Sequence, residues 1–331
     1  MHQLPLWKFI SQQLTLHHPV ILLCVVESNG SSPGRQGFKM AVSGNEMIGS
    51  IGGGIMEHKF VELAKENLRQ GSSITFIRKQ FHQKSAIKDQ SGMICSGEQT
   101  ILLYPLGEKN LPFIQKIISA LENNNTGQLK ITFSEIEFVD SNIKEDELGF
   151  NMRSETDFTY TERIGFINHL YIIGGGHCAL ALSKLMNGMD FYIHLYEERE
   201  NLNTMIENNF VHEKIMVNDY SELAELIPEG IYNPVGRAAR AGWQTYIAIM
   251  TFGYRTDDIA VRALANKNFR YMGVLGSESK MKQLFNEWRK VGISESWLST
   301  IHAPIGIQIK SETPEEIAVS IAAQIIKIKN T

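Results

Sequence analysis

A predicted strand, a glycine-rich turn and a predicted helix follow one another near the middle of the chain. His169–Ile173 is an apolar run typical of a buried strand, and the turn Gly174-Gly175-Gly176-His177-Cys178-Ala179 follows it. In the pattern Gly174-x-Gly176-x-x-Ala179, the first glycine allows the tight turn and the second lets the backbone approach a phosphate. This pattern predicts a parallel α/β sheet with an anion-binding turn before its first helix.

An acidic residue follows this turn at the spacing expected of a dinucleotide site. Phe191–Tyr196 predicts a second strand that ends at Glu197, where a carboxylate would accept hydrogen bonds from a ribose. Further strands, separated by helical stretches, are expected near Ile215–Val217, Tyr246–Met250 and Tyr271–Leu275. This alternation predicts a Rossmann-like, doubly wound parallel sheet, whose candidate NAD(P)-binding residues are Gly174, Gly176, His177 and Glu197. The alternative is a unit that keeps this architecture and binds no nucleotide.

The length of the chain favours two domains, because 331 residues exceed what one hydrophobic core usually supports. We expect an N-terminal α/β domain over residues 1–125 and the Rossmann-like C-terminal domain over residues 168–331. The least periodic stretch, residues 126–167, is expected to hold short alternating strands and the acidic stretch 144–147 in an irregular connecting segment. Thr313-Pro314-Glu315-Glu316 predicts the capped start of the last helix.

Two glycine-rich loops in the N-terminal half form a candidate phosphate site. The first carries Arg35 and Lys39 beside Ser31-Ser32-Pro33-Gly34, and the second is Gly52-Gly53-Gly54 at the start of a helix. Converging backbone amides with two cations nearby predict a cradle for a phosphate. Glycines that only form tight turns explain the same pattern and are the alternative.

Among the three cysteines, Cys95 is the candidate for chemistry. It lies in a loop of small residues, Met93–Glu98, where an accessible thiolate could bind a soft metal or carry sulfur. A buried, inert cysteine is the alternative at this position. Cys24 lies within an apolar run and is predicted to be inert, and Cys178, in the first turn of a helix, is a weaker candidate.

The composition excludes several classes of protein. A net charge of -4 and a sequence pI of about 6.2 give no strong field for nucleic acid or for an anionic membrane. No run approaches the roughly 20 apolar residues of a membrane span. Residues 1–16 lack the apolar core of a secretion signal, so we expect a cytoplasmic protein.

Several segments, taken in order, carry a resemblance to a known family. In the N-terminal half these are Glu27–Met40, with a G-S-x-P-R/G-x-x-G-x-K/R-M pattern, Gly49–Glu57, with G-S-I-G-G-G-x-x-E, and the turn Cys95–Glu98. In the C-terminal half they are Gly273–Lys280, with G-x-x-G-S-x-x-K, His302–Gly306 and Thr313–Ile321. Over nearly its whole length the chain resembles the XdhC/CoxI family of xanthine dehydrogenase accessory factors. Ile55 stands where many members carry a second cysteine, and Phe252 stands where members often have a histidine.

This resemblance implies a maturation chaperone rather than a catalyst. Such a protein binds molybdenum cofactor (molybdopterin) transiently, protects it while its sulfido ligand is installed, and passes it to a molybdenum hydroxylase such as xanthine dehydrogenase. A cysteine desulfurase is a further expected partner, and a homodimer is the base-rate expectation. The resemblance makes Cys95 the catalytic residue and metal ligand. It also makes cofactor-binding candidates of Arg35, Lys39, Gly52, Gly53, Gly54, Gly276, Ser277, Lys280 and His302.

Two other functional classes stay open. An NAD(P)-dependent oxidoreductase would need a general acid facing the nicotinamide, for which Lys280 and His302 are the candidates. A scaffold without any small ligand is the other class. The segment Tyr232–Gly242, rich in arginine and alanine, matches no pattern.

Overall fold

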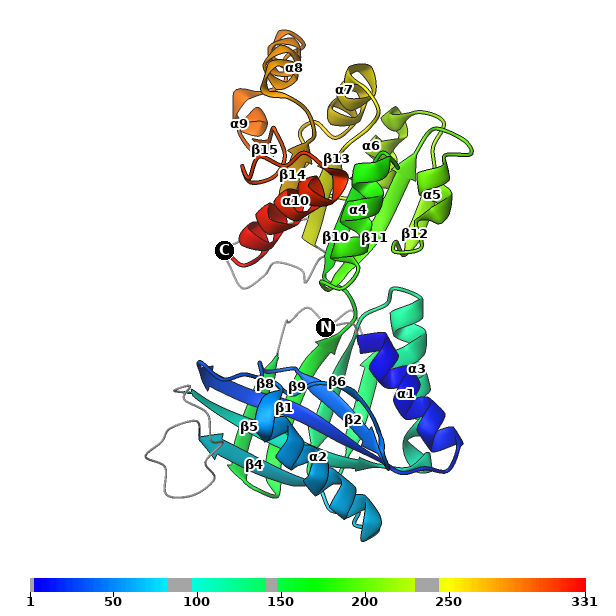
Figure 1. Cartoon of the computed structure of the whole chain (residues 1–331), viewed down its shortest axis with the longest axis vertical. Helices are drawn as coiled ribbons and strands as arrows, with labels where there is room; N and C mark the ends of the chain where they lie inside the picture. Colours follow the sequence, from blue (N-terminus) through cyan, green and yellow to red (C-terminus); the bar gives the residue numbers. More distant parts are fainter. Residues whose placement is uncertain (1–2, 82–96, 141–147, 230–243) are drawn as a thin grey trace. The chain divides into compact units, whose positions relative to one another are not determined.

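The computed structural model describes residues 3–81, 97–140, 148–229 and 244–331. The chain forms two compact units, Met1–Gly165 and Phe166–Thr331 (Figure 1). Each unit has its own hydrophobic cores. Within the described ranges, no helix has both the length and the apolar character that a membrane span requires.

The first unit is built on an antiparallel sheet with the strand order β3-β2-β1-β5-β4. Its strands are β1 (Val20–Gly30), β2 (Lys39–Ser43), β3 (Glu46–Gly49), β4 (Phe76–Phe81) and β5 (Gly97–Leu106). The apolar run of β1 is buried on both faces of this sheet. Leu22 and Cys24 face one core while Ile21 and Leu23 face the other, because successive side chains of a strand point to opposite faces.

Helices cover both faces of this sheet. On one face, α2 (Gly54–Arg69) packs through Met56, Phe60 and Ala64, whose spacing places them on one side of the helix. On the other, α1 (Gln3–Thr15) and α3 (Leu111–Glu122) pack against each other, as Figure 1 shows. The 3-10 helix η1 (Glu108–Asn110) leads into α3.

Within the segment expected to be an irregular connection, residues 127–140 and 149–164 form a second antiparallel sheet in the first unit. Its strands, in the order β7-β6-β9-β8, are β6 (Gly127–Thr132), β7 (Ile136–Asp140), β8 (Gly149–Ser154) and β9 (Asp157–Ile164). Leu129 and Ile131 of β6 and Tyr160 of β9 are fully buried. Within each of these two strands, polar residues alternate with the buried ones. Short strands with one buried face give an alternating pattern, which is weak over five or six residues.

The second unit is the expected Rossmann-like sheet. Its parallel strands follow the order β12-β11-β10-β13-β14-β15, which is the Rossmann order 3-2-1-4-5-6 when β10 is counted as the first strand. The strands are β10 (Asn168–Ile173), β11 (Phe191–Glu197), β12 (Glu213–Met216), β13 (Gln244–Ile249), β14 (Tyr271–Val274) and β15 (Ile301–His302). The strand order reverses between β10 and β13, where ligands of such sheets bind beyond the carboxyl ends of the strands.

Helices lie on both faces of the parallel sheet. On one face α4 (His177–Met186) and α10 (Pro314–Lys329) pack side by side (Figure 1). On the other lie α7 (Tyr254–Ala263) and α8 (Glu278–Lys290). The shorter helices are α5 (Asn203–Glu207), α6 (Leu223–Leu226), α9 (Glu295–Leu298) and η2 (Tyr220–Glu222). The predicted capping box of the last helix is confirmed, because the Thr313 hydroxyl accepts the Glu316 amide at 3.2 Å.

Candidate functional site

Three glycine-bearing segments that are far apart in the sequence pack together in the first unit. A Cβ atom added to Gly34 would lie 2.1 Å from the Ile51 carbonyl oxygen, and one added to Gly52 would lie 2.5 Å from the Gly34 amide nitrogen. A Cβ atom on Gly97 would lie 2.6 Å from the Ser32 amide nitrogen. These backbones can approach so closely only because the positions lack side chains. The N-terminal family motifs are therefore neighbours in space.

Lys39 does not lie free beside these loops. Its side chain is 4% exposed and forms an ion pair with Glu162 of β9 at 2.5 Å. It also donates a hydrogen bond to the Gly37 carbonyl at 2.9 Å. The expectation that Lys39 neutralises a ligand phosphate is wrong for this structure, because its charge is already compensated in the interior.

The cradle expected at Gly52–Gly54 is filled by a carboxylate of the chain itself. Glu57 of α2 accepts hydrogen bonds from the Ser50 hydroxyl at 2.6 Å and from the amides of Ile51 and Gly53 at 2.9 and 3.0 Å. Burial raises the pKa of Glu57, but these hydrogen bonds outweigh it and lower the pKa. A negative charge at the start of α2 disfavours a phosphate there, so the structure corrects the predicted cradle.

Arg35 is the candidate cation that stays accessible. Its side chain is exposed and donates one hydrogen bond, from Nη1 to the Gly30 carbonyl at 3.1 Å. Cys95 lies outside the described residues, two positions before Gly97 in the sequence. Cys24 is fully buried, and burial raises the pKa of its thiol to about 12, as expected of an inert cysteine.

In the second unit, the two glycines of the turn after β10 have different roles. Gly174 has a φ of 101°, and a Cβ atom added to it would lie 2.5 Å from the Met250 carbonyl oxygen. The fold therefore requires a glycine at this position. A Cβ on Gly176 would meet no atom of the described residues within 4 Å. His177 next to it is exposed and Cys178 is half-buried. The open space at Gly176 lies where a ligand of a Rossmann turn approaches.

Glu197 ends β11 as predicted, but its carboxylate is fully buried and accepts hydrogen bonds from several segments of the second unit. It accepts hydrogen bonds from the amides of Gly175, Glu198 and Arg199 at 2.7, 3.0 and 2.9 Å. It also accepts Arg199 Nε and Nη2 at 2.9 and 2.7 Å and the Tyr220 hydroxyl at 3.3 Å. Burial raises the pKa of Glu197, but these donors lower it to about 2. The predicted contact with a ribose is therefore corrected, because both carboxylate oxygens are saturated.

Lys280 has a partner that the sequence did not suggest. Its ammonium forms an ion pair with the fully buried carboxylate of Asp257 and donates to the Leu275 carbonyl at 3.2 Å. Thr251, which follows β13, donates its hydroxyl to Asp257 at 2.6 Å. This pair lies at the same carboxyl edge as the Gly174–Gly176 turn. Asp257 was missed because it lies within a polar helical stretch, 23 residues from Lys280.

The remaining candidates of this edge have local structural roles. The Ser277 hydroxyl caps α8 by accepting the Lys280 amide at 3.3 Å, and Gly276 precedes this cap. The His302 ring stacks on Tyr271 with ring centroids 5.0 Å apart, and burial lowers the pKa of His302. The structure thus brings these residues to the carboxyl ends of β14 and β15.

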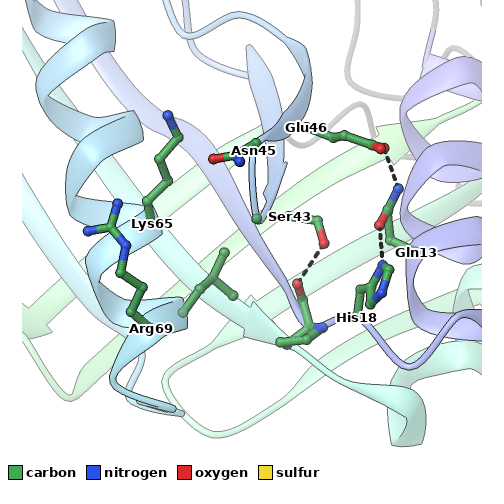
Figure 2. Close-up of a pocket in the computed structure, with 10 residues that line it drawn as sticks. Gln13, His18, Ser43, Asn45, Glu46, Lys65 and Arg69 are labelled. Carbon is green, nitrogen blue, oxygen red and sulfur yellow. Dashed lines mark hydrogen bonds between the residues drawn. The ribbon is translucent and has the colours of Figure 1, made fainter.

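A separate pocket of 450 Å³ in the first unit is poorly suited to a phosphate (Figure 2). Lys65 and Arg69 of α2 line one side, but each forms an ion pair on its own helix, with Glu62 and Glu66 at 3.0 Å. On the other side, the Glu46 carboxylate adds a negative charge to the pocket and accepts a hydrogen bond from Gln13 at 2.6 Å. The pocket therefore offers no uncompensated cation among its lining residues.

Comparisons with known proteins agree with the motifs. Residues 170–325 match the XdhC Rossmann domain, and residues 14–78 match the XdhC and CoxI family. The chain is 22% identical over 317 residues to the uncharacterized protein YqeB of Escherichia coli, covering 94% of this chain and 44% of that protein. It is 33% identical over 81 residues to a probable xanthine dehydrogenase subunit of Bacillus subtilis, covering 24% of this chain and 22% of that protein. The chain thus spans less than half the length of these relatives.

A solved structure shares the fold of the whole chain. The crystal structure of a xanthine dehydrogenase from Bacillus halodurans matches 100% of this chain and 96% of its own, with a TM-score of 0.72 and 20% sequence identity. At this identity the match establishes the fold alone. The family matches, in contrast, fall on sequence in both units, at the motifs of the glycine-rich loops and of the Rossmann sheet. The chain belongs to the XdhC and CoxI family.

Proposed function

We propose that this protein is an accessory protein of a xanthine dehydrogenase-type molybdenum hydroxylase, which binds molybdenum cofactor, protects it during sulfuration and delivers it to the client enzyme. Family membership supports the accessory role, and the names of two similar proteins support the class of client. The observation that carries the proposal is the close packing of the loops at Gly34, Gly52 and Gly97, since it gathers the family motifs at one place. Cys95 lies two positions before Gly97 in the sequence.

The described residues fit an anionic cofactor through Arg35 and not through the second loop. Arg35 uses one of its nitrogens for the Gly30 carbonyl, which leaves others to donate to a phosphate. The second loop does not fit, because the Glu57 carboxylate already accepts hydrogen bonds from the amides of Ile51 and Gly53. When bound, the cofactor supplies a thiophilic metal and a phosphate. In this proposal Arg35 holds the phosphate, and the Cys95 thiolate offers a soft ligand or carries sulfur.

Titration of the purified full chain with molybdenum cofactor tests this proposal. We expect Arg35→Ala to weaken binding by roughly 1.5–3 kcal/mol, the usual cost of one charge-assisted hydrogen bond. Arg153→Ala is the matched control, because Arg153 is an exposed arginine of the same unit that lies 3.9 Å from Asp157. Wild-type protein that binds no cofactor would contradict the proposal.

A second candidate function is an NAD(P)-dependent oxidoreductase. The pairing of Lys280 with the buried Asp257 favours it, since a positioned lysine at the carboxyl edge of a Rossmann sheet could act as a general acid. Denaturation of purified protein separates the two functions. Release of a pterin, detected by its fluorescence after acid oxidation, supports the accessory role, whereas release of a nicotinamide supports the oxidoreductase.

A further inference from the structure

The edge of the parallel sheet near β11 offers a cation to a ligand where Rossmann sheets commonly offer a carboxylate. In a site that reads an unmodified ribose, the acid after the second strand must have oxygen lone pairs facing the ligand. Glu197 has none available, because backbone amides, Arg199 and Tyr220 surround both of its oxygens. Glu197 is fully buried, whereas the Arg199 side chain that covers it is 34% exposed.

Arg199 is held in place from two sides. Its Nε and Nη2 atoms form a two-pronged contact with the Glu197 carboxylate at 2.9 and 2.7 Å. The face of its guanidinium group lies 4.9 Å from the centroid of the Phe252 ring, which follows β13 and is 61% exposed. The third nitrogen, Nη1, has no partner within the described part of the chain. Glu197 compensates the charge of Arg199, but an arginine fixed in this way can still donate from Nη1 to an anion at little cost in side-chain entropy.

These two residues lie on either side of the point where the strand order reverses. Arg199 follows β11, the second strand of the Rossmann order, and Phe252 follows β13, the fourth. The Gly174–Gly176 turn lies between them in the sheet order, after β10, with open space at Gly176. In a Rossmann fold, an arginine beside the second strand accommodates the 2′-phosphate of an NADP-type dinucleotide.

We propose that this edge of the second unit binds a 2′-phosphorylated adenine dinucleotide in preference to the form without that phosphate, and that Arg199 reads the 2′-phosphate. The site does not depend on the cofactor role proposed for the first unit. Glu198 and Asp219 are nearby carboxylates that oppose binding. Burial and the neighbouring Asp219 raise the pKa of Glu198.

Calorimetric titration of the full chain with NADP⁺ and NAD⁺ tests the preference. We expect NADP⁺ to bind at least about tenfold more tightly, as one added charge-assisted hydrogen bond implies. Two fragments test the position of the phosphate. We expect 2′,5′-ADP to bind more tightly than 3′,5′-ADP, which carries the same charge at a different place. Equal affinities, tighter binding of NAD⁺, or no binding of either dinucleotide would overturn the proposal.

Matched variants test the residue. Arg199→Gln should remove the preference for NADP⁺ and leave NAD⁺ binding nearly unchanged, and Glu198→Gln should strengthen NADP⁺ binding. Arg262→Gln is the control, because Arg262, in the last turn of α7, is another partly exposed arginine of this unit that pairs with a carboxylate, that of Asp258 at 2.8 Å. Circular dichroism verifies that each variant is folded. If Arg199→Gln is unfolded, Phe252→Leu provides the second test, because it removes the exposed ring against which Arg199 lies and should reduce the preference for NADP⁺. A preference for NADP⁺ retained in folded Arg199→Gln, together with unchanged NADP⁺ affinity in Glu198→Gln, would assign the phosphate to another residue.

Discussion

The Lys39 ammonium lies 2.5 Å from the Glu162 carboxylate, and both side chains are 4% exposed. Since β2 carries Lys39 and β9 carries Glu162, this ion pair joins the two sheets of the first unit. The Tyr160 hydroxyl donates to Glu162 at 2.6 Å, and Lys39 donates to the carbonyl of Gly37, close to Arg35 in the first glycine-rich loop. Lys39 therefore positions that loop instead of contacting a ligand.

Removing one partner of this ion pair should destabilise the protein strongly. We expect Lys39→Met to lower the free energy of unfolding by about 3–5 kcal/mol, because it leaves the Glu162 charge buried and unpaired. The double variant Lys39→Met/Glu162→Leu should recover much of this loss, since no isolated charge remains. Urea denaturation measures both. A single variant as stable as the wild type would show that the charges are not coupled in solution.

The Glu197 carboxylate should make the stability of the second unit depend on acid pH. Its folded pKa of about 2 lies below the ordinary value of 4.5, so its stabilisation is complete above about pH 4.5 and is lost as the pH falls toward 2. Glu197→Gln should be less stable at neutral pH and should lose less stability across this interval. Thermal melts between pH 2 and 7 measure the difference, with the exposed Glu207→Gln as control. Parallel pH profiles for wild type and Glu197→Gln would contradict the assignment.

The two glycines of the Rossmann turn should respond differently to substitution. Gly174→Val should prevent folding of the second unit, because the backbone has a positive φ and the Met250 carbonyl blocks the side chain. Gly176→Val should fold, because its Cβ meets no atom within 4 Å, but it should block a nucleotide at this turn. Melting curves and nucleotide titration test this pair. Unchanged nucleotide affinity in folded Gly176→Val would exclude the turn from the site.

The sequence predicted the Rossmann sheet because its signals are local. Gly174, Gly176 and the strand before them lie within a few residues, and the apolar strands of a parallel sheet stand out as continuous runs. Short alternating strands were expected in residues 126–167, but their pairing into one sheet was not predicted, because strands such as β6 have one buried face and a weak alternating pattern.

The candidate site was less predictable because its partners are distant in sequence. Lys39 and Glu162 are 123 residues apart, so nothing near Lys39 showed that its charge is compensated. Glu197 was placed correctly at the end of β11, but its burial depends on how Arg199 and Tyr220 fold over it. The positions of these charged groups were predictable, whereas their partners required the structure.

Reconstitution of an apo molybdenum hydroxylase tests whether the first unit binds and delivers molybdenum cofactor through the family motifs and Cys95. Cofactor-loaded wild type, Cys95→Ser and Cys24→Ser are compared for the hydroxylase activity they restore, alongside thermal melts. We expect Cys95→Ser to melt like the wild type and to lose most of the transfer, because serine offers no soft ligand and carries no sulfur. Cys24→Ser should be less stable, since it buries a hydroxyl, and should keep transfer per folded molecule. Full transfer of cofactor by Cys95→Ser would contradict the proposed role of Cys95.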